Sequence, residues 1–372
     1  MILSFFDNAK VGEVPQKVKD VYVEKPEGIK VEIWQQNLEI PWSLVFLPNG
    51  DALVSERPGR IRIIQNGTLK EDVYANIPNV MHSKGSEAGL MGIALHPNFA
   101  SQPYVYAMYT FQEGNVNDNR VIRLKHNGSN ATFDKIIVDG IPAGRNHNGG
   151  RIKFGPDGML YITAGETFER ELAQDMESLG GKILRVTPDG AVPNDNPFPG
   201  SIIYSLGHRN PQGLAWHPET GDLFSSEHGP SGEMRLTGND IINIIKPGKN
   251  YGWPKVVGKV NMKEFEDPII MWEAATPPSG MVFWNNNLYV TTLRSKALMH
   301  IQMNKTGDDY EITRIERWFS PKQNEGVYGR FRDVTVGPDG DMYVLTNNRD
   351  GRGNPTENDD RILRISKMVA GS

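Results

Sequence analysis

Short apolar strands follow small polar turns at regular intervals along this chain of 372 residues. The turns are rich in Pro, Gly, Asp or Asn, and each leads into a run of strand length. Six stretches share the pattern: PNGDALVSE from Pro48, HPNFASQPYVYAMY from His96, GPDGMLYITAG from Gly155, HPETGDLFSSE from His217, WNNNLYVTT from Trp284 and GPDGDMYVLTN from Gly337. They start roughly 50 to 65 residues apart, a spacing typical of four-stranded blades. The pattern predicts an all-β fold, a six-bladed β-propeller with four-stranded antiparallel blades.

The beginning of the chain differs from the rest. Residues 1–28 are polar and predict an irregular N-terminal segment. The next run, IKVEIWQQ (Ile29 to Gln36), alternates apolar and polar positions like a half-exposed strand, which is well placed to complete the last blade of a closed ring. Propellers commonly run long as single units, so we assign residues 29–372 to one catalytic propeller domain.

Secondary features refine this picture. Strands of alternating basic and apolar residues accompany the repeats and predict outer or middle blade strands with their arginines in solvent; they are GRIRII (59–64), GKILRV (181–186) and DRILRI (360–365). Long connections rich in Gly, Asn and His are where we expect function to concentrate. They span residues 79–89, 139–150, 191–211 and 229–252.

Composition excludes several classes of protein. The formal net charge is -5 and the pI is near 6.0, which argues against nucleic acid and anionic membranes as partners. The chain has no cysteine, so it has no disulfide framework and no thiolate nucleophile. No apolar run approaches the roughly 18 residues that span a bilayer, which predicts no membrane insertion. No signal peptide is recognisable, so the protein is expected to be cytoplasmic or to have an export signal outside this sequence.

The loop GRNHNGGRIKFGPDG places His147 just ahead of a blade strand. A neutral imidazole takes up a proton near physiological pH, so His147 is a candidate general base. Glu166, in ITAGET at the end of the following strand, is a candidate partner that orients it. The alternatives are a surface histidine bonded to its own turn and a solvated turn carboxylate.

A second loop, LGHRNPQGLAWHP, carries Arg209, Asn210 and Gln212 around a proline. Donors of fixed geometry in such a connection suit the carbonyl or carboxylate oxygens of a ligand. The alternative is a structural plug that satisfies loop carbonyls.

The segment SSEHGPSGEMRLTGND contains oxygen donors of the kind that calcium accepts. They are the side chains of Glu227, Glu233 and Asp240 and the carbonyls of Gly229 and Pro230. Their spacing matches no EF-hand loop, so the metal motif is weak.

Cations come from the last two blades. Arg294 ends NLYVTTLR, and Arg330 and Arg332 flank a phenylalanine in GRFRDVTV, where residues two apart share one face of a strand. Three guanidinium groups that converge on the mouth would bind a small polycarboxylate. The alternative is a rim of ion pairs, such as Arg332 with Asp333.

Five motifs in this order give a stronger signal than each alone. HNGGRIKFGPDGMLYITAGE, SLGHRNPQGLAWHP, SEHGP, NYGWP and GRFRDVTVGPDGDMYVL make the chain similar to the soluble pyrroloquinoline quinone (PQQ) dependent glucose and aldose sugar dehydrogenases, over about residues 34–366. The resemblance implies calcium-bound PQQ at the mouth and oxidation of an aldose at C1 to the lactone. It also implies an external electron acceptor, a periplasmic or secreted location, and a monomer or homodimer.

The resemblance assigns roles around the reacting centre. His147 matches the base that removes the C1 hydroxyl proton while hydride moves to C5 of the quinone, and Glu166 stands at the position of its acidic partner. Arg209 and Asn210 match the pair at the reactive carbonyl edge of PQQ, which gives Arg209 a catalytic role, and Gln212 follows in the same motif.

Further roles concern the ligands themselves. Gly229 and Pro230 match the carbonyls that hold the calcium, and Glu87, in SEAGLMG, sits where cofactor or substrate is contacted. Trp272, in MWEAATPPSG, falls near an aromatic residue that borders the sugar in relatives. The basic residues matching those on the PQQ carboxylates are Arg294, Arg330 and Arg332.

One segment departs from the family. After Gly229 and Pro230 the family soon reaches an Asp-Glu-Ile-Asn run, whereas SGEMRLTGNDIIN is longer and has Ile241 where Glu is common. Two other functions stay open from the residues. One is a calcium-dependent lactonase or related hydrolase, with a metal held by side chains on the axis, and the other is a binding propeller without catalysis.

Overall fold

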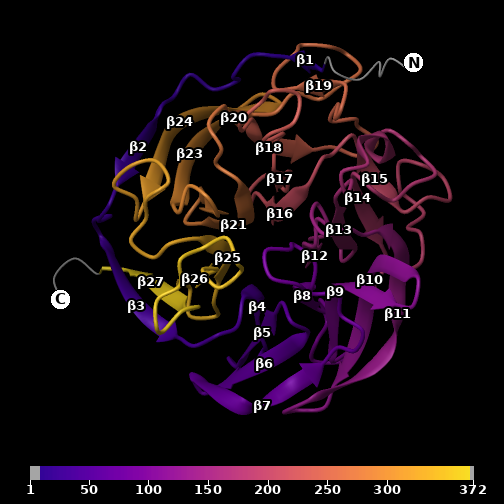
Figure 1. Ribbon diagram of the computed structural model, residues 1–372, viewed down its shortest axis with the longest axis vertical. Helices are drawn as coiled ribbons and strands as arrows, with labels where there is room; N and C mark the ends of the chain where they lie inside the picture. The colour runs from indigo at the N-terminus through magenta and orange to yellow at the C-terminus, as the bar shows by residue number, and fades with distance from the viewer. Residues whose placement is uncertain (1–8, 369–372) are drawn as a thin grey trace.

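The computed structural model describes residues 9–368, which form seven β-sheets; six of them are arranged as blades around a central axis, and the seventh is a two-stranded sheet (Figure 1). Both ends of the chain, residues 1–8 of the predicted N-terminal segment and residues 369–372 of the predicted propeller domain, lie outside the described range. The predicted six-bladed propeller with four-stranded antiparallel blades is confirmed.

Each blade begins near the axis and runs outward through antiparallel neighbours (Figure 1). The first blade is β4 (Pro41–Phe46), β5 (Ala52–Glu56), β6 (Arg60–Gln65) and β7 (Thr68–Asn76). The second is β8 (Leu90–Leu95), β9 (Tyr104–Glu113), β10 (Val116–His126) and β11 (Ala131–Pro142), and the third is β12 (Ile152–Phe154), β13 (Leu160–Ala164), β14 (Lys182–Val186) and β15 (Ile203–Leu206). The fourth is β16 (Pro211–Trp216), β17 (Leu223–Glu227), β18 (Asp240–Ile245) and β20 (Ile270–Trp272), and the fifth is β21 (Pro278–Trp284), β22 (Asn287–Thr292), β23 (Leu298–Thr306) and β24 (Asp309–Trp318).

The sixth blade joins strands from opposite ends of the described chain. It consists of β25 (Phe331–Val336), β26 (Met342–Thr346), β27 (Ile362–Lys367) and β3 (Ile29–Gln35). Strand β3 pairs antiparallel with β27, with Val31 opposite Ile365. The strand predicted over Ile29 to Gln36 therefore closes the ring as expected.

The prediction that residues 1–28 are irregular is wrong for two stretches. Strand β1 (Lys10–Val11) runs parallel to β19 (Val256–Val257), and β2 (Asp20–Val23) runs parallel to β24 at the outer edge of the fifth blade. Both strands are short and largely exposed, so they give too few alternating apolar and polar positions to identify a strand. Their order comes from the backbone partners that the edge strand supplies.

Basic residues on the third strands do not all reach solvent as predicted. Arg60 and Arg364 are partly exposed, but Lys182 and Arg185 on β14 are buried. The Nζ of Lys182 donates to the carbonyl oxygens of Leu172 and Gly180, at 2.6 and 2.8 Å. The connection between β13 and β14, which includes the 3-10 helix η1 (Arg170–Ala173), covers Lys182. This lysine is therefore buried at a position that would otherwise face solvent.

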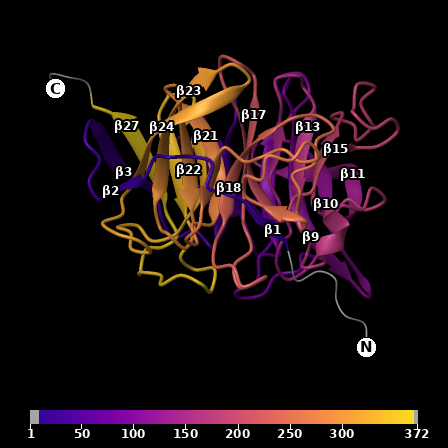
Figure 2. The ribbon, with the colours of Figure 1, turned by 90° about the horizontal axis from the view of Figure 1, so that it is seen from above.

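Two kinds of connection meet on one face of the ring. One kind is the loops between the second and third strands of a blade, and the other is the loops between successive blades. A view from the side shows the ring as a thick disc (Figure 2). Beneath them, Arg151 and Asp333 form a buried ion pair of 2.9 Å between β12 and β25, and Trp42 stacks on Arg151. Within residues 9–368, no helix has the length and apolar character needed to cross a membrane.

Candidate active site

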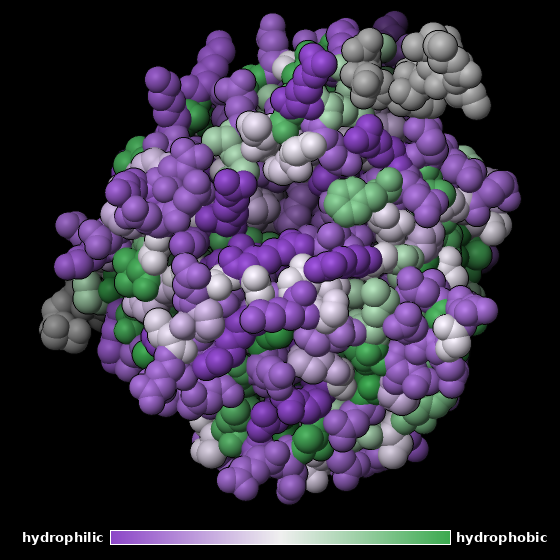
Figure 3. Space-filling model, viewed as in Figure 1, coloured by the Kyte–Doolittle hydropathy of each residue, from purple (hydrophilic) through white to green (hydrophobic). Residues whose placement is uncertain are grey.

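A cavity of about 410 Å³ opens on the loop face, which lies within the roughly 300–1,000 Å³ usual for small-molecule sites. The space-filling view shows a hollow near the middle of this face with a mainly hydrophilic rim (Figure 3). Almost all of the lining residues stand on loops between strands. The lining comprises Glu87, Asn146, His147, Phe168, Arg209, His228, Gly229, Ser231, Asp240, Ala275, Pro277, Leu293, Arg294, Arg330 and Arg352.

His147 and Glu166 form a buried pair at the edge of this cavity. The Nδ1 atom of His147 makes a short hydrogen bond with Oε1 of Glu166, whose side chain has no exposed surface. The backbone N–H of Phe168 also donates to that oxygen, at 3.2 Å. The second carboxylate oxygen has no partner among the described residues, so the imidazole is the principal group that compensates the buried carboxylate.

The backbone around His147 is fixed by close packing. His147 has a positive φ of 57°, and its N–H donates to Oε2 of Glu87 at 3.0 Å. On the other side, a Cβ atom at Gly165 would lie only 2.1 Å from the carbonyl oxygen of His147. Glycine is therefore required next to Glu166, and the strand end of β13 holds the imidazole in place.

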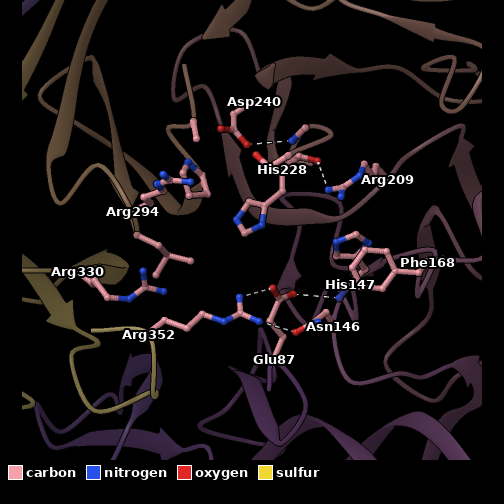
Figure 4. Close-up of a pocket in the computed structure, with 15 residues that line it drawn as sticks. Glu87, Asn146, His147, Phe168, Arg209, His228, Asp240, Arg294, Arg330 and Arg352 are labelled. Carbon is pink, nitrogen blue, oxygen red and sulfur yellow. Dashed lines mark hydrogen bonds and ion pairs between the residues drawn. The ribbon is translucent and has the colours of Figure 1, made fainter. Parts of the chain in front are cut away.

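Glu87 links the loops of three blades. Its carboxylate accepts from Nδ2 of Asn210 at 3.2 Å and pairs with Nη1 of Arg352 at 2.9 Å (Figure 4). Burial alone raises the pKa of Glu87, but His228, His147 and Arg352 outweigh it and hold this pKa well below its usual range. Glu87 is therefore an anion, and it organises the lower wall of the cavity.

Arg209, Asn210 and Gln212 are placed at different depths. Arg209 lines the cavity, whereas Oδ1 of Asn210 accepts from the N–H of Gly149 at 3.0 Å and from Nε2 of Gln212 at 3.1 Å. Gln212 does not reach the lining, and its Oε1 accepts from Nη1 of Arg332 at 3.0 Å. The predicted donors therefore lie at increasing depth, from Arg209 at the cavity wall to Gln212 beneath the lining.

The three predicted arginines gather on one side. Arg294 is exposed and lines the cavity, and Arg330 lines it while pairing with Asp350 at 2.8 Å. Arg332 lies deeper, where burial and the nearby charge of Arg57 hold its pKa well below the ordinary value. The Nε atoms of Arg330 and Arg332, and Nε and Nη2 of Arg57, meet no acceptor within residues 9–368. This excess of buried cationic donors suits an anionic ligand.

The predicted oxygen donors do not form a carboxylate metal site. Glu227 accepts from His208 and from the N–H of Arg209, and Glu233 pairs with Arg209. Asp240 lines the cavity, but its two oxygens accept from the N–H groups of Gly229 and Thr276, at 2.9 and 2.6 Å, and burial raises its pKa to about 6. Over the described range, no three His, Cys, Asp or Glu side chains are grouped to hold a metal ion.

Backbone carbonyls are the remaining donors for a cation. Gly229 lines the main cavity and Pro230 lines an adjoining hollow beside Trp253. No hydrogen bond between described residues engages the carbonyl oxygen of either residue. Two carbonyls are fewer than the six to eight oxygens that calcium takes, so a calcium ion here would need oxygens from a bound ligand.

Trp272 is not at the cavity, contrary to the prediction. It lies on β20, the outer strand of the fourth blade, within a hydrophobic cluster, and its Nε1 donates to Asp20 at 3.3 Å. The aromatic residue that the structure places in the lining is Phe168, whose ring centroid lies 3.9 Å from that of His147 (Figure 4). Phe168 is 52% exposed and has a positive φ of 69°.

Several lining residues were missed from the sequence. His228 stands in the SEHGP motif, which could have indicated it, and burial lowers its pKa to about 3, so its neutral form is favoured. Arg352 lies in a long loop with no motif, and Phe168 follows Glu166 in an ordinary turn. Only the folded loops bring these last two side chains to the mouth.

Comparisons with known proteins identify the family of the chain. The family model described as Glucose / Sorbosone dehydrogenase matches residues 38–363. The aldose sugar dehydrogenase of Escherichia coli is 33% identical over 88% of this chain and 92% of its own. The PQQ-bound structure of an aldose sugar dehydrogenase from Streptomyces coelicolor is 40% identical, with a TM-score of 0.77 over 91% of this chain and 98% of that one. The crystal structure of a glucose dehydrogenase-like oxidoreductase from Thermus thermophilus is 49% identical, with a TM-score of 0.85 over 91% of this chain and 100% of that one.

Proposed function

The chain belongs to the glucose/sorbosone dehydrogenase family of oxidoreductases, and we propose that it oxidises an aldose sugar at C1 to the lactone with calcium-bound PQQ as cofactor. One observation carries this proposal. A histidine held by a buried carboxylate faces a cavity that also presents Arg209, Arg294 and Arg330. A base and several cations around one cavity suit the oxidation of an alcohol beside a polycarboxylated quinone.

The donor set fits a cofactor with carboxylates and carbonyls. Arg294 and Arg330, which line the cavity, supply cationic donors for carboxylate groups, and the buried charge of Arg332 lies beneath them. Arg209 supplies donors for a carbonyl edge. Asn210 lies beneath the lining, where its amide bonds to Glu87 and Gln212 and holds the wall in place. PQQ, when bound, supplies a quinone carbon that accepts a hydride.

The proton of the sugar hydroxyl goes to Nε2 of His147 in this proposal. Because the Glu166 carboxylate accepts from Nδ1, Nε2 carries the lone pair, and the buried carboxylate stabilises the imidazolium that forms. Phe168 covers one side of the imidazole and limits its contact with water. Glu87 fixes the backbone of His147 and offers a carboxylate to a sugar hydroxyl.

The carbonyl oxygens of Gly229 and Pro230 would hold the calcium ion together with oxygens of the cofactor. A divalent cation at this place acts as a Lewis acid beside the reacting carbonyl. These two carbonyls accept no hydrogen bond from protein donors within the described range, which supports the assignment.

The family resemblance also suggests an electron acceptor and a location for the reaction. We propose that electrons pass to an external acceptor and that the protein works in the periplasm or outside the cell, as the family resemblance implies. The lactonase alternative has less support, because the described residues hold no cluster of metal-binding side chains on the axis.

Reconstitution tests the proposal directly. Apo protein with PQQ, calcium, glucose and a dye acceptor should bleach the dye, and omission of PQQ or treatment with a chelator should abolish the reaction. His147→Ala should lose turnover and keep PQQ binding, measured by absorption titration. Lactone hydrolysis without dye reduction, or full turnover by His147→Ala, would contradict the proposal.

A further inference from the structure

Glu233 pairs with two arginines at the edge of the cavity. It lies in the loop between β17 and β18. Its Oε2 lies 2.8 Å from Nε and 2.6 Å from Nη2 of Arg209, and its Oε1 lies 3.3 Å from Nη2 of Arg170. The side chain is only 13% exposed, so solvent screens this pairing less than a surface ion pair.

These contacts fix the plane of the Arg209 guanidinium. A guanidinium has five N–H groups in one plane; Oε2 of Glu233 accepts from Nε and forms an ion pair with Nη2 at 2.6 Å, so the edge of the guanidinium formed by Nε and Nη2 faces the carboxylate. The carbonyl oxygen of His228 accepts from Nη1 at 3.2 Å. One N–H on Nη1 and one on Nη2 remain for a ligand in the cavity that Arg209 lines.

The loop that carries Glu233 is itself anchored. The N–H of Leu236 donates to the carbonyl oxygen of Glu233 at 2.8 Å, and the N–H of Gly232 donates to the carbonyl oxygen of Leu236 at 2.9 Å. Met234 and Leu236 pack against a small cluster that includes Trp253. The Glu233 carboxylate is therefore presented to Arg209 by a closed, packed turn.

We propose that Glu233 is a positioning residue, which directs the two free N–H groups of Arg209 at the reacting oxygen of the bound quinone. This rests on the proposed function. Glu233 also opposes the charge of Arg209, so its removal makes the cavity more positive and does not weaken the attraction for an anionic quinone. Its loss is expected to lower the rate of hydride transfer, because the free N–H groups are no longer held in one direction.

A first experiment tests the contact without cofactor. Apo wild type, Glu233→Ala and the control Glu264→Gln, an exposed acid on a nearby loop, are treated with phenylglyoxal, and modified arginines are mapped by peptide mass spectrometry. Arg209 should react several-fold faster in Glu233→Ala than in the other two proteins, while Arg294 reacts equally in all three. An unchanged rate at Arg209 would overturn the proposal, whatever the cofactor of the protein.

A second experiment separates rate from affinity. The affinity of Glu233→Gln and Glu233→Ala for PQQ is measured by absorption titration, and the reduction of bound PQQ by saturating glucose is followed in a single turnover. We expect unchanged or tighter PQQ binding and a rate about tenfold lower in Glu233→Ala, with Glu233→Gln between it and wild type.

The remaining outcomes are also decisive. The role of Glu233 is overturned if both variants have a normal rate. It is also overturned if affinity and rate fall in parallel, as they would in a damaged pocket. The proposed function stands in both cases. If wild type itself binds no PQQ, the proposed function fails, and the role that depends on it fails as well.

Discussion

The Nδ1 atom of His147 is hydrogen-bonded to Oε1 of Glu166, a carboxylate with no exposed surface. A carboxylate only accepts, so Nδ1 carries the hydrogen and the lone pair lies on Nε2. The fixed backbone of His147, tied to Glu87 on one side and to the strand end at Gly165 on the other, leaves the imidazole one position. In the proposed reaction, this pair would set the direction of proton transfer.

Glu166→Gln should disable the base while keeping the pocket. An amide NH₂ can donate to Nδ1, which moves the hydrogen to Nε2 and removes the lone pair that accepts the sugar proton. We expect kcat to fall by about 10²-fold or more, with unchanged PQQ affinity. Steady-state kinetics and PQQ titration measure this, with Glu169→Gln, an exposed acid three residues away, as the control. A Glu166→Gln enzyme as fast as the control would contradict the pairing as a catalytic feature.

Arg294→Ala should weaken cofactor binding at little cost in stability. Arg294 is exposed at the cavity, and no carboxylate of the described chain pairs with it. Loss of one charge-assisted hydrogen bond costs about 1.5–3 kcal/mol, which corresponds to an increase of at least about tenfold in the Kd for PQQ. Calorimetric titration measures the Kd, and Lys322→Ala, an exposed cation outside the lining, is the control. Equal affinities would remove Arg294 from the cofactor site.

The two aromatic residues Phe168 and Trp272 should behave differently. Phe168→Ala removes an exposed ring at the cavity, so we expect KM for the sugar to rise about two- to tenfold with an unchanged melting temperature. Trp272→Ala removes a buried ring from the fourth blade, so we expect a loss of about 3–5 kcal/mol in the free energy of unfolding. Sugar kinetics and urea unfolding separate the two effects. A sugar KM that responds to Trp272 in a stably folded variant would restore its predicted role.

Lys182 should make the stability of the protein rise with pH. Burial lowers its pKa to about 8 from an ordinary value of 10.5, so between these values the unfolded chain binds more protons than the folded one. The free energy of unfolding therefore increases through this window, by on the order of 3 kcal/mol in total.

Lys182→Met should lack that increase. Urea unfolding at about pH 7.5, 9 and 10, which covers most of the window between the two pKa values, measures the difference between the variant and wild type. Lys125→Met, at an exposed position of β10, serves as control. The Lys182→Met curve should be flatter than both others. Parallel curves for all three proteins would show that Lys182 titrates like a solvated lysine.

The blades could be predicted from the sequence because each of them repeats the same pattern of a small polar turn followed by an apolar strand. A strand such as Leu160–Ala164 follows its Pro-Asp-Gly turn directly, so local pattern is sufficient to identify it. The closing strand Ile29–Gln35 was predictable from its own alternation of apolar and polar residues. The strands of the N-terminal segment depend on partners distant in sequence, at β19 and β24, which no local pattern encodes. The burial of Lys182 depends on how the preceding connection folds back over β14, which the alternation of the strand does not show.

The site likewise contains some residues that the sequence located and others that it did not. Resemblance located His147, Glu166, Arg209, Arg294 and Arg330, which the structure brings to one cavity or its wall. It failed for Trp272, because a matching position in the sequence does not fix the direction of a side chain. The pairing of Glu233 with Arg209 joins two loops that are 24 residues apart in sequence, and no motif links the two positions.

The sixth blade has a consequence for how the protein is made. Its inner three strands are synthesised last, whereas its outer strand, β3, has already left the ribosome before any complete blade exists. Arg330 and Arg352, which complete the cavity, belong to that blade and its loops. The cavity of the nascent protein therefore cannot be completed blade by blade, because it closes only after the sixth blade has been synthesised.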